Sequence, residues 1–179
     1  MRETDYGPKM GLALKAVATM HSQVSRLLSD CDGLFPDYES VFGNYATSEL
    51  TYHVKADFWM AEGVYRYWFQ QGQSLLGLMA MFHGREGKPE QPLFVVGRID
   101  YIDITSQNVK QRCNGWHLWR AMTDWAPQPP RLGEVIDLSD PNSEGTIQNM
   151  RLIAVPLFQI ENLDDVRMLF GRLNVQLSE

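Results

Sequence analysis

The run LLGLMAMFHGREGKPEQPLFVVGRIDYIDI, residues 75–104, carries the clearest fold signal in the chain. Its two ends, residues 75–83 and 93–104, are apolar at consecutive positions, which is typical of central strands covered on both faces. The segment between them, GREGKPEQ, has the glycines and polar residues of a hairpin loop. The run therefore predicts two antiparallel neighbouring strands within a sheet.

Further strand patterns lie on both sides of this hairpin. LTYHV at 50–54 alternates between apolar and polar residues, and VYRYWFQ at 64–70 carries aromatic residues on both faces. Residues 134–138 predict a short strand, and residues 150–160 predict another, in which Pro156 indicates an edge position or a bulge. The sheet should therefore include strands from before and after the hairpin.

Helical periodicity occurs in three segments. Residues 8–31 place apolar side chains at spacings of three and four, which predicts an amphipathic helix. Residues 32–48, interrupted by glycine, proline and asparagine, then predict a long connection. A middle helix is predicted over 108–125, capped by Asn108 or Ser106, and a last helix after Asn162, where two aspartates favour the N-terminus.

The order of these elements predicts an α+β fold. Strands follow one another without the regular alternation of strand and helix that marks a parallel sheet. We expect a mainly antiparallel sheet of about five to six strands, with an N-terminal, a middle and a C-terminal helix packed on it. The 179 residues fit one α+β domain spanning 1–179.

Composition and charge argue against several kinds of partner. The net charge is −6 and no cluster of lysine and arginine is visible, which argues against nucleic-acid binding. The longest apolar run is far shorter than the ~20 residues that span a bilayer, and the N-terminus lacks the apolar stretch of a signal peptide. We therefore expect no membrane association and a cytoplasmic location, where Cys31 and Cys113 stay free thiols.

The segment CNGWHLWRAMTDW, residues 113–125, supplies the first candidate site. On one continuous helix, Cys113, His117, Arg120 and Asp124 would share a side, and Trp116 would flank it. Cysteine and histidine four residues apart could form a thiolate–imidazolium pair. The competing interpretation is a buried helix in which Arg120 pairs with Asp124, Trp116 belongs to the core, and His117 lies at the edge of any pocket.

A second candidate site is the aromatic segment around residues 58–69. Its two faces are both aromatic, so one should meet the core and the other a helix, a ligand or a second subunit. We predict ligand contacts from Tyr65, Tyr67 and Trp68 together with Trp116, His117 and Arg120, and we expect a homodimer. No spacing typical of metal ligands occurs, so neither a metal nor a cofactor is predicted.

These observations favour a non-catalytic intracellular binding or regulatory module that recognises a protein partner or a small ligand through an aromatic-rich surface. Two alternatives stay open. One is an enzyme that depends on Cys113 and His117, and the other is a structural subunit of a larger assembly.

Overall fold

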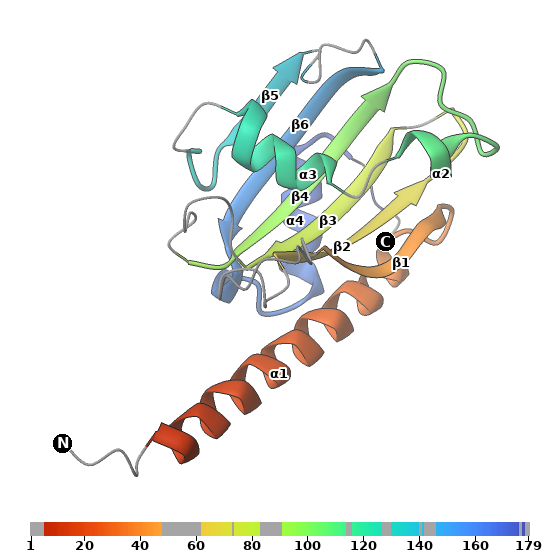
Figure 1. Cartoon of the computed structure of the whole chain (residues 1–179). Coiled ribbons are helices and arrows are strands. Elements are labelled where there is room, and N and C mark those ends of the chain that lie inside the picture. Colours follow the sequence, from red (N-terminus) through yellow and green to blue (C-terminus); the bar gives the residue numbers. More distant parts are fainter. Residues whose placement is uncertain are drawn as a thin grey trace.

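The computed structural model describes residues 6–47, 62–72, 74–82, 91–113, 116–126, 130–139, 141, 146–175 and 177. Figure 1 shows a curved sheet with helices on both sides and a long N-terminal helix. The helices and strands are, in chain order, α1 (Tyr6–Asp30), η2 (Cys31–Leu34), β1 (Glu39–Thr47), β2 (Gly63–Phe69), β3 (Leu75–Met81), β4 (Leu93–Tyr101), α2 (Val109–Arg112), α3 (His117–Arg120), η5 (Ala121–Trp125), β5 (Val135–Ser139), β6 (Ile147–Pro156), η6 (Leu157–Gln159) and α4 (Leu163–Arg172).

The strands form one six-stranded sheet in the order β1-β2-β3-β4-β6-β5, and every neighbouring pair is antiparallel. The predicted hairpin is confirmed: β3 and β4 pair from Leu75↔Ile99 to Met81↔Leu93. The α+β fold with an antiparallel sheet and N-terminal, middle and C-terminal helices is confirmed as well.

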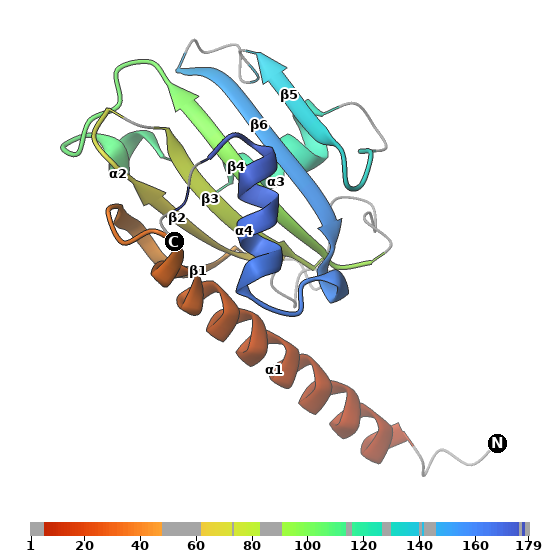
Figure 2. The same ribbon diagram turned by 180° about the vertical axis from the view of Figure 1, so that it is seen from behind.

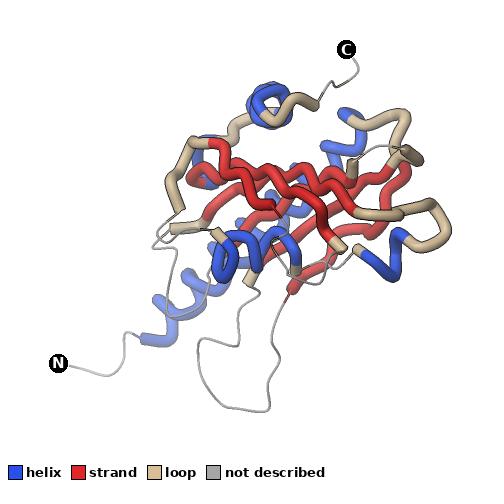
Figure 3. The backbone as a smooth tube through the Cα atoms, turned by 90° about the horizontal axis from the view of Figure 1, so that it is seen from above, coloured by secondary structure: helices blue, strands red, loops and turns tan. Residues whose placement is uncertain are grey.

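Two hydrophobic cores lie on opposite faces of the sheet, and β4 contributes to both because its side chains alternate. Val95 and Ile99 belong to the face covered by α2, α3 and η5, which we call the α3 face. Phe94 and Val96 belong to the face covered by α4, η2 and the end of α1, which we call the α4 face. Figures 2 and 3 show these layers from behind and from above.

The predicted connection over residues 32–48 is wrong in its second half, which forms the edge strand β1. Gly43 and Asn44, which indicated a break, lie where the pairing of β1 with β2 shifts register between Phe42 and Tyr45. A bulge admits extra residues into an edge strand without ending it. The strand predicted at 50–54 lies outside the described residues.

The predicted middle helix over 108–125 is also wrong as one continuous element. α2 ends at Arg112, and Cys113 has an extended backbone, with φ −72° and ψ 119°. The chain re-enters a helix at His117 and closes with the π-helical turn η5. Asn108 does begin α2, but its side chain makes no capping bond and accepts a hydrogen bond from the Thr105 backbone instead.

The other elements agree with expectation. α4 begins with a capping box in which the Asn162 side chain accepts from the backbone and Asp165 accepts in return. β5 and β6 match the predicted late strands. The edge position or bulge predicted from Pro156 is wrong, because β6 is an inner strand and Pro156 is its last residue, beyond the last pair with β5. Proline lacks a backbone N–H, and this loss is tolerated at the end of a strand.

α1 confirms the predicted first helix, but its two halves have different environments. Near its end, Val24 and Leu28 are buried against the α4 face. Its first half extends past the sheet (Figures 1 and 2), and Met10 and Leu14 are 65% and 66% exposed. The apolar stripe of α1 is therefore used by its own chain over only part of its length. None of the described helices is long and apolar enough to cross a bilayer.

Candidate ligand-binding site

The predicted site residues divide between the two faces of the sheet. Tyr65 and Tyr67 of β2 and Trp116 pack in or against the core of the α3 face. Trp68, which alternates with them along β2, lies in the core of the α4 face. Since Tyr67 is 0% and Trp68 1% exposed, these two side chains do not form one aromatic surface of the folded chain.

Leu118 fixes the segment after Cys113 against the sheet. Gly77 and Gly97 are paired in neighbouring strands, and their missing side chains leave a hollow on the α3 face. A Cβ at Gly97 would lie 2.4 Å from Leu118 Cδ2, and one at Gly77 would lie 2.5 Å from the Tyr67 ring. The hollow therefore accepts Leu118 and Tyr67, and the Leu118 backbone N–H donates to the Tyr67 hydroxyl over 3.4 Å.

His117 is buried beside Leu118, which reverses the sequence expectation. Trp116, predicted as core, is only partly buried, whereas His117, predicted at a pocket edge, is 7% exposed. Arg120, three residues after His117, is exposed. His117 Nδ1 lies 2.5 Å from the hydroxyl of Tyr101.

Cys113 and His117 are both held in their neutral forms. Burial raises the pKa of the Cys113 thiol well above its ordinary value, although a hydrogen bond with Tyr101 opposes the shift. Burial, followed by the charge of Arg120, lowers the pKa of His117 to about 4. Tyr101 interacts with both groups, so the arrangement favours a neutral hydrogen-bonded cluster over the thiolate–imidazolium pair that cysteine catalysis needs.

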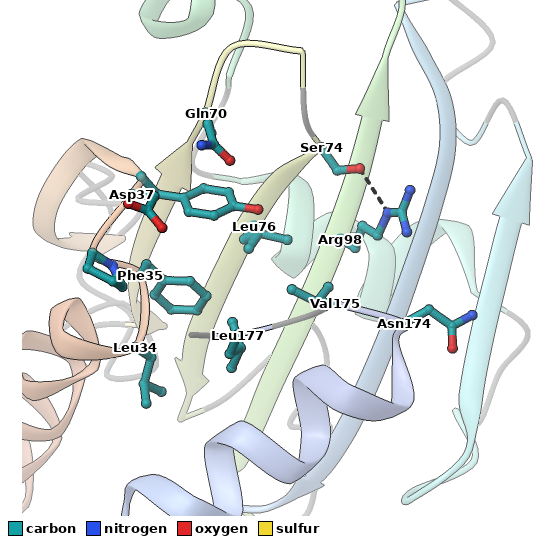
Figure 4. Close-up of a pocket in the computed structure, with 12 residues that line it drawn as sticks. Leu34, Phe35, Asp37, Gln70, Ser74, Leu76, Arg98, Asn174, Val175 and Leu177 are labelled. Carbon is teal, nitrogen blue, oxygen red and sulfur yellow. Dashed lines mark hydrogen bonds between the residues drawn. The ribbon is translucent and has the colours of Figure 1, made fainter. Parts of the chain in front are cut away.

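An open pocket of about 340 Å³ lies on the α4 face, between η2 and the chain that follows α4. Figure 4 shows the apolar walls formed by Phe35, Leu76, Val175 and Leu177. Polar and charged side chains also line the pocket. They are Asp37, Tyr38, Gln70, Ser74, Arg98 and Asn174.

Arg98 is the cationic group of this pocket, and it is held from one side only. Its Nε donates to Ser74 Oγ over 2.8 Å and lies 3.3 Å from Asp100 Oδ1. Ser74 in turn donates to Asp100, so the carboxylate and the hydroxyl together orient the guanidinium. Within the described part of the chain, the two terminal nitrogens of Arg98 donate no hydrogen bond, and they point away from Ser74 (Figure 4).

Tyr38 adds a second donor to the lining. Burial raises the pKa of Tyr38, and the charge of Arg98 opposes this shift. The phenol therefore stays protonated near neutral pH. Asp37 also lines the pocket, on the side opposite Arg98 in Figure 4. A protonated hydroxyl and a guanidinium edge suit a carboxylate placed at the Arg98 side, away from Asp37, while the apolar walls suit a hydrocarbon or aromatic body.

Only one part of this pocket follows a local pattern. Alternation along β4 places Arg98 and Asp100 on one face, where they form an ion pair. The pocket itself joins Arg98 with residues 34–38, with Gln70, Ser74 and Leu76, and with Asn174, Val175 and Leu177, which are far apart in the chain. No local pattern predicts that these segments meet.

Comparison of the chain with protein-family models, with curated proteins and with solved structures gives no match.

Proposed function

We propose that this protein is a non-catalytic binding module that holds a small organic molecule with an acidic group in the pocket at Arg98. The observation that carries the proposal is the geometry of that arginine. Ser74 and Asp100 hold its Nε edge, while its terminal edge makes no hydrogen bond to the described residues. A guanidinium oriented in this way can form two parallel hydrogen bonds to a carboxylate. Because its side chain is already ordered, less conformational entropy is lost on binding.

The pocket has the size and the lining of a small-ligand site. Its volume of about 340 Å³ lies at the lower end of the range for such pockets, roughly 300–1,000 Å³. Phe35 and Leu76 offer an apolar contact on the sheet side, and Val175 and Leu177 offer another from the chain after α4. A monocarboxylate with one aromatic ring or a short aliphatic chain fits this combination.

The same reasoning makes the cysteine-dependent enzyme a weaker alternative. A catalytic thiolate needs a lowered pKa and access to substrate. Cys113 is buried, and its thiol pKa is raised by that burial. The structural-subunit alternative stays open, since a subunit can also bind a ligand.

An intracellular location and a homodimer belong to the proposal as well. Both cysteines are free and buried, and Cys31 and Cys113 lie in the cores of opposite faces. Free thiols are typical of a reducing compartment. The aromatic strand β2, which first suggested the homodimer, does not support it, because its own chain already covers both of its faces. The homodimer must therefore use another surface.

Binding is tested with a panel of matched pairs, benzoate against benzamide and phenylacetate against phenylacetamide, by thermal shift and titration calorimetry. We expect a carboxylate to raise the melting temperature and its neutral amide to have no effect. Arg98→Gln should abolish the shift, and Arg98→Lys should weaken it, because lysine keeps the charge but loses the planar fork.

The matched control is Arg131→Gln, which removes an arginine that is 81% exposed and that forms, among the described residues, an ion pair with Glu134, three residues on. It should leave binding unchanged. Carboxylate binding that survives Arg98→Gln, or that Arg131→Gln reduces equally, would contradict the proposed site.

A further inference from the structure

The apolar stripe of α1 follows a coiled-coil spacing. Its positions alternate between steps of four and three residues over three heptads, which is the pattern of the seam between two packed helices. The stripe consists of Met10, Leu14, Val17, Val24 and Leu28, with the polar His21 at one position of the repeat and with Cys31, the first residue of η2, at its end. A seam of this kind is completed by a second helix, whereas a stripe that meets only a sheet need not keep the strict repeat.

The C-terminal part of this seam packs against its own chain, beginning at His21, whose ring centroid lies 4.5 Å from that of Phe82. Val24, Leu28 and Cys31 are buried against the α4 face. Met10 and Leu14 are exposed, and Figures 1 and 2 both show the first half of α1 extending beyond the sheet. The first two turns of the seam therefore present apolar side chains to solvent.

An open apolar groove lies beside the second half of α1, next to the exposed part of the seam. Met20, Val24 and Leu27 form one wall of this groove, whose volume is about 500 Å³. The opposite wall is formed by the chain directly after β6 and includes Leu157 and Phe158. Phe158 is 72% exposed although it is a large aromatic residue. One continuous surface thus contains a projecting apolar helix and a groove beside the second half of the same helix.

We propose that a second copy of this chain covers this surface, with the first halves of the two α1 helices packed antiparallel around a twofold axis. In that arrangement the N-terminal turns of each helix reach toward the groove of the other copy. The contact is self-complementary, as a twofold interface requires. It rests on the expected homodimer and is independent of ligand binding at Arg98.

Charge favours this occupant and this direction. Over residues 6–25, α1 carries Lys9 and Lys15 and no acidic residue, whereas the charged residue that lines the groove is Glu161. Antiparallel packing brings the basic end of one helix toward Glu161 of the other copy. Parallel packing would instead place like-charged lysines side by side and bring both sheets to the same end of the pair.

Six apolar side chains of each copy line this surface. Met10, Leu14 and Phe158 are exposed, and a second copy would cover them, together with the area that the chain itself leaves open on Val17, Met20 and Leu27.

The proposal is tested by light scattering and sedimentation of the full chain from low to high micromolar concentration. We expect wild type to reach twice the 20.5 kDa of the chain. Leu14→Glu should raise the dimer Kd by about a hundredfold, because it places a charge in the seam. Glu161→Lys should weaken the dimer, and the added change Lys9→Glu should restore it.

Leu12→Glu is the matched control. Leu12 is 69% exposed like Leu14, but at about 100° per residue it lies about 160° around the helix from both Met10 and Leu14. Its substitution should leave the dimer intact, and circular dichroism should show the same folded sheet in all variants.

The other outcomes overturn the proposal in distinct ways. A dimer that is insensitive to Leu14→Glu would keep the homodimer but place it on another surface. A wild-type monomer across the whole range would contradict both. A monomer that cosediments with vesicles of phosphatidylcholine and phosphatidylglycerol, and loses this binding in Leu14→Glu, would assign the seam to a lipid surface instead.

Discussion

Leu118 occupies the space that a side chain at Gly97 would need: a Cβ at position 97 would lie 2.4 Å from Leu118 Cδ2. The two residues hold α3 against the centre of the sheet. Leu118 is fully buried, so a methyl group at position 97 would compete with its side chain for space in the core.

Gly97→Ala should therefore destabilise the protein by about 1–3 kcal/mol, the usual cost of overpacking a core. Leu118→Ala should cost about 2–5 kcal/mol through the cavity it leaves. The double variant should cost less than the sum by about 1 kcal/mol or more, because the truncated side chain makes room for the new methyl group.

Urea denaturation measures all three variants. Gly171→Ala is the control, since a Cβ there meets no atom within 4 Å and the residue lies in α4. That variant should be neutral or slightly stabilising. Strict additivity between positions 97 and 118 would show that the contact does not constrain the helix.

His117 should make the stability of the protein depend on pH. Its folded pKa is lowered to about 4, mainly by burial, whereas an unfolded histidine titrates near 6.5. Below pH 6.5 the unfolded chain therefore binds more protons than the folded chain, so stability falls as the pH decreases toward 4. The loss from this residue should reach about 3 kcal/mol once both forms are protonated.

Unfolding free energies of wild type and His117→Gln between pH 4 and 7.5 measure this contribution by difference. Glutamine retains an acceptor for the Tyr101 hydroxyl, so His117→Gln should lose only a little stability at neutral pH and should show a weaker decline in acid. Parallel pH profiles for the two proteins would mean that His117 titrates normally in the folded state.

Neither cysteine should react with a thiol reagent in the native protein near neutral pH. Cys31 and Cys113 are both buried, and burial raises the pKa of each thiol, that of Cys31 to about 12. Reaction requires the thiolate and access to it, so labelling should follow unfolding. Absorbance after addition of an aromatic disulfide reagent measures the rate, with denatured protein as the two-thiol reference.

Fast native labelling at Cys113 that His117→Ala suppresses would instead support the cysteine-dependent enzyme. Cys113→Ser serves as the control that assigns any fast phase to this position.

Asp32 should contribute substantially to stability although it is partly exposed. Its carboxylate accepts hydrogen bonds from Arg66 Nε over 2.8 Å and from Trp68 Nε1 over 2.7 Å. The Arg66 side chain is only 12% exposed, so removal of its carboxylate partner leaves a largely buried charge less well compensated. Asp32→Ala should cost about 2–4 kcal/mol, since breaking one side of a partly buried charge pair is expensive.

Asp30→Ala, two residues earlier, is the matched control for Asp32. Asp30 pairs with Arg26 over 3.8 Å in an exposed contact, so its loss should change stability by no more than about 0.5 kcal/mol. Urea midpoints compare the two variants directly. Equal effects at positions 30 and 32 would show that Asp32 does not hold η2 to β2.

Elements with a strong local signal follow from the sequence alone. The strands β3 and β4 follow from two apolar runs around a polar loop, and α4 follows from Asn162 and the two aspartates after it. Helical and strand periods differ, so a segment of sufficient length reveals its type without knowledge of its neighbours. These elements were enough to predict an antiparallel α+β fold.

Features that depend on pairing and packing between distant segments could not be predicted and came from the folded structure. β1 continues past Gly43 and Asn44 because its backbone pairs with β2 on both sides of a register shift. The predicted middle helix breaks at Cys113, and Leu118 occupies the hollow over Gly77 and Gly97. The pocket at Arg98 and the exposed first half of the α1 seam also depend on the fold. The sequence provides the side chains, but the packing of distant segments decides which of them meet and which face solvent.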